Sequence, residues 1–158
     1  MKFTFVDTPI GALLVAGTAE AVHEIYFAGH DPHDDWERDD GALSFAAEQL
    51  HAYFAGERQD FDLPLVPAGT EFQRAVWRRL QAIPFGETTT YGAIAHSIGR
   101  PDAVRAVGAA NGANPIPIVV PCHRVIGKSG SLTGFGGGLN VKRWLLDHEA
   151  RVAKRRLF

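Results

Sequence analysis

The chain of 158 residues contains a single cysteine, Cys122, and no run of about 18 consecutive apolar residues. One thiol cannot form an internal disulfide, and it cannot supply a zinc site built from several thiolates. Without a long apolar run no membrane-spanning helix is expected, and the start of the chain, which Asp7 and Pro9 interrupt, reads as a strand rather than a signal peptide. We therefore expect a cytoplasmic protein that does not associate with membranes.

Each half of the chain is poor in charge of one sign. Residues 1–68 hold three Lys or Arg and 13 Asp or Glu, a net charge of −10, whereas residues 69–158 hold 13 and five, a net charge of +8. This division predicts two modules, 1–68 and 69–158, of which the second faces a polyanion such as nucleic acid. A second interpretation stays open at this point, in which each half has only a solvated charged face.

The first module has the pattern of a small α/β domain. Period-two alternation predicts three short strands, and apolar residues at helical spacing predict one helix that ends near Gly56. The acidic stretch between the last strand and the helix is expected to be an exposed loop, and the last segment an extended linker. In chain order these segments are residues 2–7, 12–17, 21–27, 30–41, 42–56 and 61–69.

The second module has helical patterns. Residues 70–83 open with Thr70 and carry Gln73 three residues later, which is typical of a capping box. Residues 89–99 and 102–114 predict two short helices around a tight turn, a pattern typical of a helix-turn-helix but also of any helical hairpin. Thr89 or Thr90 is expected to cap the first helix, and Asp102 the second.

The second of these helices, 102–114, consists mostly of Ala and Gly. Small side chains on a helix are typical of close packing inside a protein, and they also allow a helix to press against a wide ligand. Arg105 projects from this smooth surface. In a basic module, it is a candidate for contact with nucleic acid.

Cys122 follows the apolar run IPIVV and Pro121. The β-branched run predicts a buried strand that ends at the thiol, and a thiol in such a place is often only a small core residue. His123 and Arg124 come next, and cations near a thiol lower its pKa. Neighbouring side chains on an extended chain point in opposite directions, so His123 acts as a base only if the chain bends or a water intervenes. Glu149 is the expected acceptor that would orient the imidazole.

The sequence PCHRVIG resembles the active-site signature of the O6-alkylguanine-DNA alkyltransferases. The preceding NPIPIVV, the following TGFGGGLNVKRWLLDHE and the upstream IPFGETTTYGAIA resemble the same family, from about Thr70 to Glu149. The resemblance implies an α+β protein. A ribonuclease H-like domain with a three-stranded antiparallel sheet and a helix would precede a mostly helical, winged-helix-like domain with a helix-turn-helix.

The resemblance also implies roles for individual residues. Cys122 would accept the alkyl group, His123 would deprotonate it through a water, and Glu149 would hold the imidazole. Tyr91 would lie against the base and supply a proton or hydrogen bond at guanine N3. Asn114 would fasten the turn before the active-site strand.

Further positions would contact DNA and the extruded base. Arg105 would fill the gap that the base leaves, on a helix face that includes Ala106, Gly108 and Ala109, with Tyr91 beside it. The carbonyls of Cys122 and Val125 would accept from the guanine amine. The loop at Phe135, Gly136 and Gly137 would line the pocket and reach O6.

The sequence departs from the family at some positions. Gly136 replaces a serine that some relatives carry, which removes a side-chain contact to O6. Asn111 replaces a bulkier apolar residue of some relatives, which predicts a more polar DNA-facing surface. The zinc-binding cysteines of certain relatives are missing, so we expect neither a metal nor another cofactor.

The resulting prediction is direct DNA repair. Double-stranded DNA that contains O6-alkylguanine, and by extension O4-alkylthymine, would be the partner, and a monomer, cooperative on DNA, would transfer the alkyl group irreversibly to Cys122 after extruding the nucleotide. Three alternatives remain: a lesion-binding relative without catalysis, which typically lacks the cysteine; a helix-turn-helix regulator; and a cysteine hydrolase. The Ala- and Gly-rich helix offers a regulator few side chains for reading bases.

Overall fold

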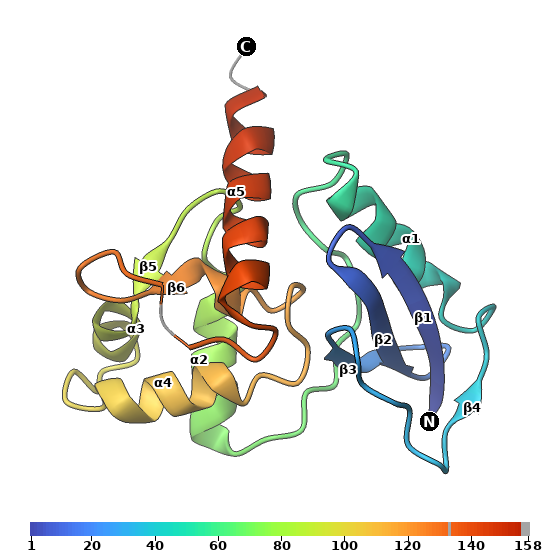
Figure 1. Cartoon of the computed structure of the whole chain (residues 1–158). Helices are drawn as coiled ribbons and strands as arrows, with labels where there is room; N and C mark the ends of the chain where they lie inside the picture. The colour runs from blue at the N-terminus through green and yellow to red at the C-terminus, as the bar shows by residue number, and fades with distance from the viewer. Residues whose placement is uncertain (133, 156–158) are drawn as a thin grey trace. The chain divides into compact units, whose positions relative to one another are not determined.

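A computed structural model describes residues 1–132 and 134–155. The chain divides into two compact units, Met1–Ala68 and Gly69–Phe158 (Figure 1). No helix among the described residues is long and apolar enough to cross a membrane.

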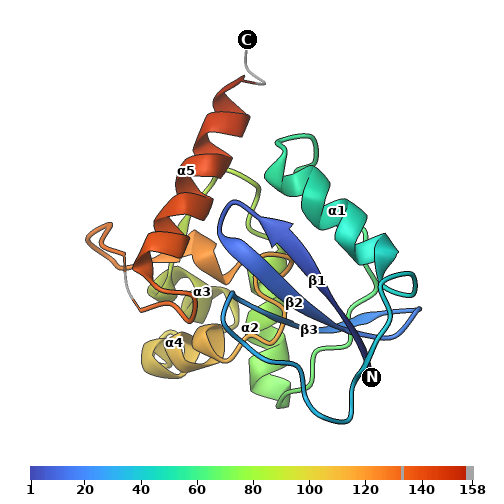
Figure 2. The same ribbon diagram turned by 45° about the vertical axis from the view of Figure 1, so that its right-hand side comes forward.

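The first unit is a sheet covered by one helix. Strands β1 (Lys2–Thr8), β2 (Gly11–Gly17) and β3 (Val22–Tyr26) form an antiparallel meander, as the alternation predicts. Helix α1 (Ser44–Phe54) packs along β1 (Figures 1 and 2). The core of this unit comes from the sheet and from the inner face of the helix, through Leu13, Leu14, Val15, Leu50 and Tyr53.

The sheet has one strand more than the sequence predicts. A two-residue strand, β4 (Glu37–Arg38), lies inside the acidic stretch and pairs in parallel with Lys2 and Phe3, which gives the order β3-β2-β1-β4. The Lys2 ammonium lies 3.0 Å from Asp39 and 3.4 Å from Glu37. The stretch is exposed here as expected, but residues 37 and 38 form a short strand instead of a loop, with these ion pairs beside it.

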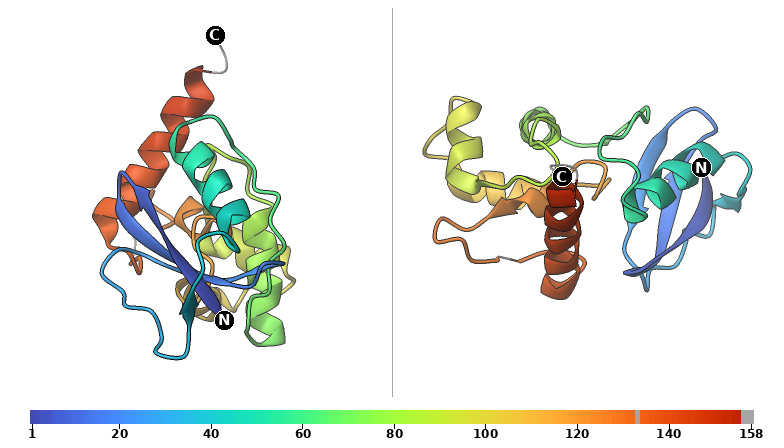
Figure 3. Two further views of the ribbon diagram at one scale, coloured as in Figure 1. Left: turned by 90° about the vertical axis from the view of Figure 1, so that its right-hand side faces the viewer. Right: turned by 90° about the horizontal axis from the view of Figure 1, so that it is seen from above.

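The second unit is mostly helical. Helix α2 (Glu71–Gln81) begins at Thr70 with the predicted capping box, because the Thr70 hydroxyl accepts from Gln73 N–H while the Gln73 side chain accepts from Thr70 N–H. Helices α3 (Tyr91–Ser97) and α4 (Val104–Gly112) follow, and both pack on α2. Strands β5 (Thr89–Thr90) and β6 (Val125–Ile126) pair in parallel. The last helix, α5 (Leu139–Arg155), extends beyond the other three (Figures 1 and 3).

The two predicted helix caps have different outcomes. Thr90 caps α3, since its hydroxyl accepts from Ala93 N–H at 3.1 Å. Asp102 does not cap α4: the N-cap residue is Ala103, which has no side-chain cap. Ala103 N–H bonds to Arg100 C=O, so a turn at 100–103 leads into the helix and leaves Asp102 one residue too early.

The apolar run before Cys122 is not a strand. Residues 116–121 are buried, but their backbone forms turns, with Val120 N–H bonded to Ile116 C=O. Ile118 has a φ of +74°, a conformation that is strained for a β-branched residue. Pro117 and Pro121 lack the N–H groups that a sheet ladder requires, so the β-branched composition reflects burial rather than strand pairing.

Candidate active site

Cys122 opens a single turn of 3₁₀ helix, η1 (Cys122–Arg124), in which every residue is buried. The thiol residue is 5% exposed. A helical turn does not place consecutive side chains on opposite sides as a strand does. The turn therefore supplies the bend that a cooperating Cys122 and His123 require.

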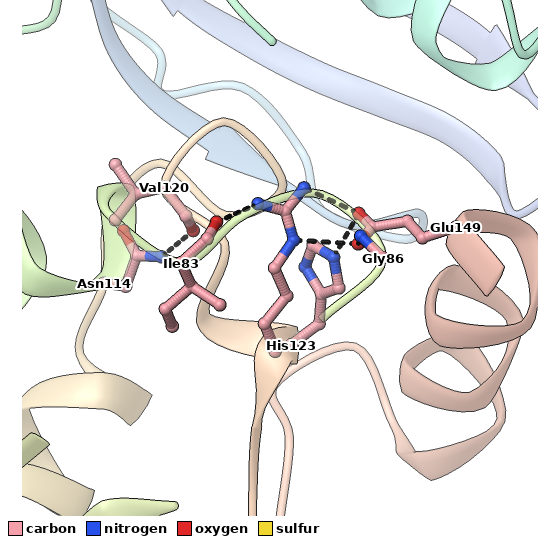
Figure 4. Close-up of polar contacts among 7 residues, drawn as sticks. Ile83, Gly86, Asn114, Val120, His123 and Glu149 are labelled. Atoms are coloured by element: carbon pink, nitrogen blue, oxygen red, sulfur yellow. Dashed lines mark hydrogen bonds and ion pairs between the residues drawn. The ribbon is translucent and has the colours of Figure 1, made fainter. Parts of the chain in front are cut away.

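His123 is held by Glu149 from helix α5. The His123 Nε2 atom lies 2.7 Å from Glu149 Oε2, and both side chains are at most 1% exposed (Figure 4). A carboxylate only accepts hydrogen bonds, so Nε2 carries the proton and Nδ1 is the unprotonated nitrogen. Within the described part of the chain Nδ1 has no hydrogen-bond partner, which leaves it able to accept a proton.

Glu149 is also the counter-ion of Arg124. The guanidinium donates from Nε to Oε1 at 2.8 Å and from Nη2 to Oε2 at 3.0 Å, while its Nη1 donates to the Ile83 carbonyl at 2.7 Å (Figure 4). Burial acts to raise the pKa of Glu149. The hydrogen bonds and charges of His123 and Arg124 outweigh it and hold that pKa well below its usual range. The carboxylate is therefore ionised at neutral pH.

The loop at Gly86 completes the surroundings of Glu149. Gly86 N–H donates to Glu149 Oε1 at 3.3 Å, with a φ of +82° at the glycine. A Cβ atom at Gly86 would lie 2.9 Å from the Cβ of Ala153 on α5. Glycine is therefore required here both for the left-handed backbone and for the close approach to the helix.

The pKa of His123 is lowered. Burial disfavours the charged imidazolium and is the largest cause, while Glu149 acts in the opposite direction. The imidazole is consequently neutral at neutral pH, which is the state a general base must have.

The thiol is not ionised in the free protein. Burial raises the pKa of Cys122 to about 11, and a hydrogen bond from Asn114 and the charge of Lys142 only partly offset it. The charges of His123 and Arg124 do not lower this pKa as expected, because His123 is neutral and the Arg124 charge is paired with Glu149; His123 lowers it only through its backbone N–H. Sulfur therefore needs a base at the moment of attack.

Lys142 is a member of the site that sequence reasoning missed. Its side chain is fully buried on α5, and Nζ donates to the Val125 carbonyl at 2.6 Å. Burial lowers its pKa. A signal was present in the sequence: Lys142 and Glu149 share a helical face with the buried Leu145 and Val152. Charged residues on the apolar face of a helix require buried partners.

Asn114 ties together the chain around the thiol. Its Nδ2 donates to Val120 C=O at 2.7 Å (Figure 4). Its Oδ1 accepts from Ile116 N–H at 3.0 Å. The same side chain lowers the pKa of Cys122. Asn114 thus fastens the turn, although the segment it holds is not the expected strand.

Helix α4 has an inner and an outer face. Val107, Ala110 and Asn111 are buried. The outer face carries the exposed Arg105 and small residues, among them Ala106 and Ala109.

Tyr91, the first residue of α3, lies near α4. A Cβ built on Gly108 would be 3.9 Å from Cδ1 of the tyrosine. Tyr91 and the α4 residues predicted to contact DNA therefore belong to one region of the unit.

The predicted pocket residues Phe135, Gly136 and Gly137 precede α5. Phe135 is half-buried, and the Lys142 Nζ atom lies 5.9 Å from the centre of its ring. Val125 is buried and begins β6, directly after η1. Lys142 thus connects this loop to the Val125 carbonyl.

Asn111 does not face outward as the sequence suggests. It is 4% exposed, and its Nδ2 lies 3.4 Å from the Cys122 carbonyl oxygen. The expectation that it makes the DNA-facing surface more polar was wrong, because Asn111 lies on the inner face of α4, where its amide faces the backbone carbonyl of Cys122.

Comparison with known proteins gives consistent results for both units. The profile of the ribonuclease-like domain of 6-O-methylguanine DNA methyltransferase matches residues 1–67, and that of its DNA-binding domain matches residues 71–151. Methylated-DNA–protein-cysteine methyltransferase from Mycobacterium tuberculosis is 53% identical over 152 residues, which are 94% of this chain and 92% of the relative. The Methanosarcina acetivorans protein of the same name is 48% identical over 94% of this chain and 98% of its own.

A solved structure extends the similarity to three dimensions. The crystal structure of Mycobacterium tuberculosis OGT in complex with DNA superposes with a TM-score of 0.92 at 51% identity, covering 96% of this chain and 94% of that one. The fold and the sequence therefore point to the same relatives.

Proposed function

The chain belongs to the methylated-DNA–protein-cysteine methyltransferase family and repairs DNA by methyl transfer from O6-methylguanine, and we propose that Cys122 is the acceptor, with His123 as its base. The arrangement of the Cys122 turn against His123 and Glu149 carries this proposal. It supplies the three groups of a proton relay: the thiol of Cys122, the neutral imidazole of His123 and the ionised carboxylate of Glu149.

The proposed step balances in atoms and charge. His123 Nδ1 takes the thiol proton through one bridging water, and sulfur attacks the methyl carbon as the bond from that carbon to guanine O6 breaks. Tyr91 donates a hydrogen bond or proton at guanine N3, so negative charge does not accumulate on the leaving base. The tyrosinate that results from proton donation regains a proton from water, and the His123 imidazolium releases one to water, so in the balance the thiol loses a proton, guanine gains one, and the methyl group moves to sulfur.

Burial makes the resting thiol unreactive, and the thiolate that attacks is stabilised by neighbouring groups rather than by burial. The Asn114 side chain and the charge of the Lys142 ammonium both lower the pKa of Cys122 against the dominant effect of burial. Arg124 keeps Glu149 ionised. Glu149 in turn stabilises the imidazolium that forms when His123 accepts the proton.

The product is a thioether, which has no carbonyl for water to attack. The methyl group would therefore stay on Cys122, and each protein molecule would act once. A longer alkyl group and O4-alkylthymine would follow the same chemistry if they fit the pocket of Val125, Phe135, Gly136 and Gly137.

The proposed DNA contacts start from the outer face of α4. Ala106, Gly108 and Ala109 leave little side-chain volume, so the helix can lie in a minor groove, while Arg105 enters the base stack and Tyr91 supports the extruded base. We propose that one protein molecule is sufficient for transfer, with cooperative binding along DNA as an additional property.

The three alternative functions agree less well with the observations than methyl transfer does. A lesion-binding relative without catalysis typically lacks the cysteine, and Cys122 is present beside a base. A helix-turn-helix regulator needs side chains that read bases, and the outer face of α4 is largely Ala and Gly. A cysteine hydrolase would turn over repeatedly on acyl substrates, whereas the family relatives are methyltransferases.

The test is transfer from a duplex that contains one O6-methylguanine. We expect the peptide with Cys122 to gain the mass of one methyl group, with no more than one methyl per protein even in excess DNA, and Cys122→Ser to gain none. A duplex with unmodified guanine is the matched control. Unmodified Cys122 together with unrepaired DNA would contradict the proposal, and a second methyl elsewhere on the chain would contradict the assignment to this residue.

A further inference from the structure

Asn111 is a buried amide that the proposed mechanism does not use. It lies on the inner face of α4, and its Nδ2 is 3.4 Å from the Cys122 carbonyl oxygen. Its Oδ1 is buried and has no hydrogen-bond partner among the described residues. The orientation of the amide follows from chemistry. The amide oxygen and the Cys122 carbonyl oxygen are both acceptors and cannot hydrogen-bond to each other, so the amide nitrogen must face the carbonyl. Oδ1 is therefore an acceptor that awaits a donor.

The two backbone carbonyls that the family resemblance assigns to the guanine amine, those of Cys122 and Val125, differ in the number of lone pairs still available. A carbonyl oxygen has two lone pairs. That of Cys122 already accepts from Val125 N–H, which closes the η1 turn, and from Asn111. That of Val125 accepts from Lys142 at 2.6 Å, which leaves it one lone pair among the contacts described. The family resemblance assigns both carbonyls to the guanine amine, but here only Val125 has an open position.

We propose that Asn111 Oδ1 accepts one hydrogen of the 2-amino group of the extruded guanine, while the Val125 carbonyl accepts the other. This inference rests on the proposed function and adds a residue that selects for a 2-aminopurine. The amine has two hydrogens, and the site offers two acceptors with free lone pairs. Asn111 Nδ2 keeps its hydrogen bond to the Cys122 carbonyl. The Asn111 side chain therefore contacts both the backbone of the thiol residue and the amine of the guanine.

The test compares two lesions that differ only at the 2-position. Duplexes carry either O6-methylguanine or O6-methylhypoxanthine, which has hydrogen in place of the amine, and single-turnover transfer to Cys122 is followed for the wild type and Asn111→Leu. We expect the variant to lose about tenfold in rate on O6-methylguanine, the size of one hydrogen bond, and less than about threefold on O6-methylhypoxanthine. The ratio of the rate on O6-methylguanine to the rate on O6-methylhypoxanthine would therefore be smaller in the variant than in the wild type.

Trp77→Phe is the matched control for loss of a buried hydrogen bond. Trp77 Nε1 donates at 2.8 Å to the carbonyl of Ala110, the residue before Asn111. We expect this variant to lower the melting temperature while the ratio of the two rates stays at the wild-type value. If Asn111→Leu does not fold, Asn111→Ala is measured in the same way.

Three results would overturn the inference. Equal losses on both lesions would mean that Asn111 has only a structural role. Wild-type rates on both lesions would mean that it does not meet the amine. A faster reaction of the variant on O6-methylguanine would mean that the asparagine competes with the amine for the Cys122 carbonyl. A wild type that transfers no methyl from either duplex would instead contradict the proposed function itself.

Discussion

Glu149 stabilises the site through one carboxylate that serves three partners. His123, Arg124 and Gly86 N–H all converge on its two oxygens. Removing its charge leaves the Arg124 guanidinium buried without a counter-ion, and such a loss is large. The carboxylate is therefore as important for folding as for orienting the imidazole.

We expect Glu149→Gln to lower the free energy of unfolding at pH 7 by about 3–5 kcal/mol, the usual cost of breaking a buried ion pair. Urea denaturation measures this free energy. The exposed neighbour Asp147 on the same helix supplies the control, since Asp147→Asn should change stability by less than about 0.5 kcal/mol. Similar losses in the two variants would contradict the role of the ion pair.

The same groups predict how stability depends on pH. The folded pKa of His123 is lowered, so as the pH falls below about 6.5 the unfolded state binds this proton first and stability decreases. The folded pKa of Glu149 is also lowered, so its contribution is complete above about pH 4.3 and is lost as the pH falls toward the folded value. Both effects have the same sign.

We therefore expect the free energy of unfolding to decrease continuously from pH 7 to pH 4, and the part of this decrease below about pH 4.5 to be smaller in Glu149→Gln than in the wild type. Urea denaturation at several pH values measures both slopes. A wild-type stability that is constant over this range, or that rises on acidification, would show that the buried imidazole and carboxylate titrate as they do in the unfolded chain.

Residue types and spacing sufficed to indicate Cys122, His123 and Glu149, and the structure brings the last two within hydrogen-bond distance. They did not indicate Arg124 and Lys142 as buried residues. A sequence displays the charge of a side chain, but the partner that makes its burial tolerable comes from another element. For Arg124 the partners are Glu149 and the Ile83 carbonyl, and for Lys142 the partner is the Val125 carbonyl; backbone carbonyls carry no mark in the sequence.

At the scale of elements, helices were easier to predict than the segment that carries the thiol. The helix α2 has its capping box and its apolar face within a few residues of sequence, so its start at Thr70 is local information. Residues 116–121 have the composition of a strand, yet in the described part of the chain their bridge pairing is the isolated one between Pro117 and Val120, and their prolines remove donors. Their turns depend on Asn114 and on burial in the unit.

Helix α4 gives a prediction that concerns its outer surface. We expect Ala109→Leu to slow repair of O6-methylguanine in duplex DNA at least about tenfold, because the added side chain keeps the helix out of the minor groove. Reaction with the free base O6-methylguanine should stay near the wild-type rate, since Ala109 is exposed and the helix keeps its fold. Single-turnover kinetics on the two substrates measures the difference.

Ala150→Leu, at an exposed position on α5, is the control for a bulkier helix surface, and both of its rates should be unchanged. Arg105→Ala gives the complementary variant: repair in the duplex should fall while reaction with the free base persists. Equal losses on duplex and free base in either α4 variant would place its effect in the active site and not at the DNA.

For the whole molecule, the division of charge matters more than its sum. The chain carries −2 overall, but the unit with the thiol carries +8 and the other unit −10. Counter-ions are released from DNA by the cations that contact phosphates, so affinity follows the local field and not the net charge. A protein with a slightly negative total can therefore bind DNA with a strong dependence on salt.

We expect a plot of log affinity for undamaged duplex DNA against log salt concentration to have a slope steeper than about −2.7, the value for three phosphate contacts. Fluorescence anisotropy at salt concentrations from about 50 to about 200 mM measures this slope. The double variant Asp31→Asn with Asp34→Asn, both at exposed positions, removes two negative charges from the acidic unit. Its slope should equal that of the wild type, because the number of phosphates contacted is unchanged. A slope near zero in the wild type would mean that α4 binds DNA mainly through uncharged contacts, and a steeper slope in the double variant would mean that the acidic unit also lies within reach of the phosphates.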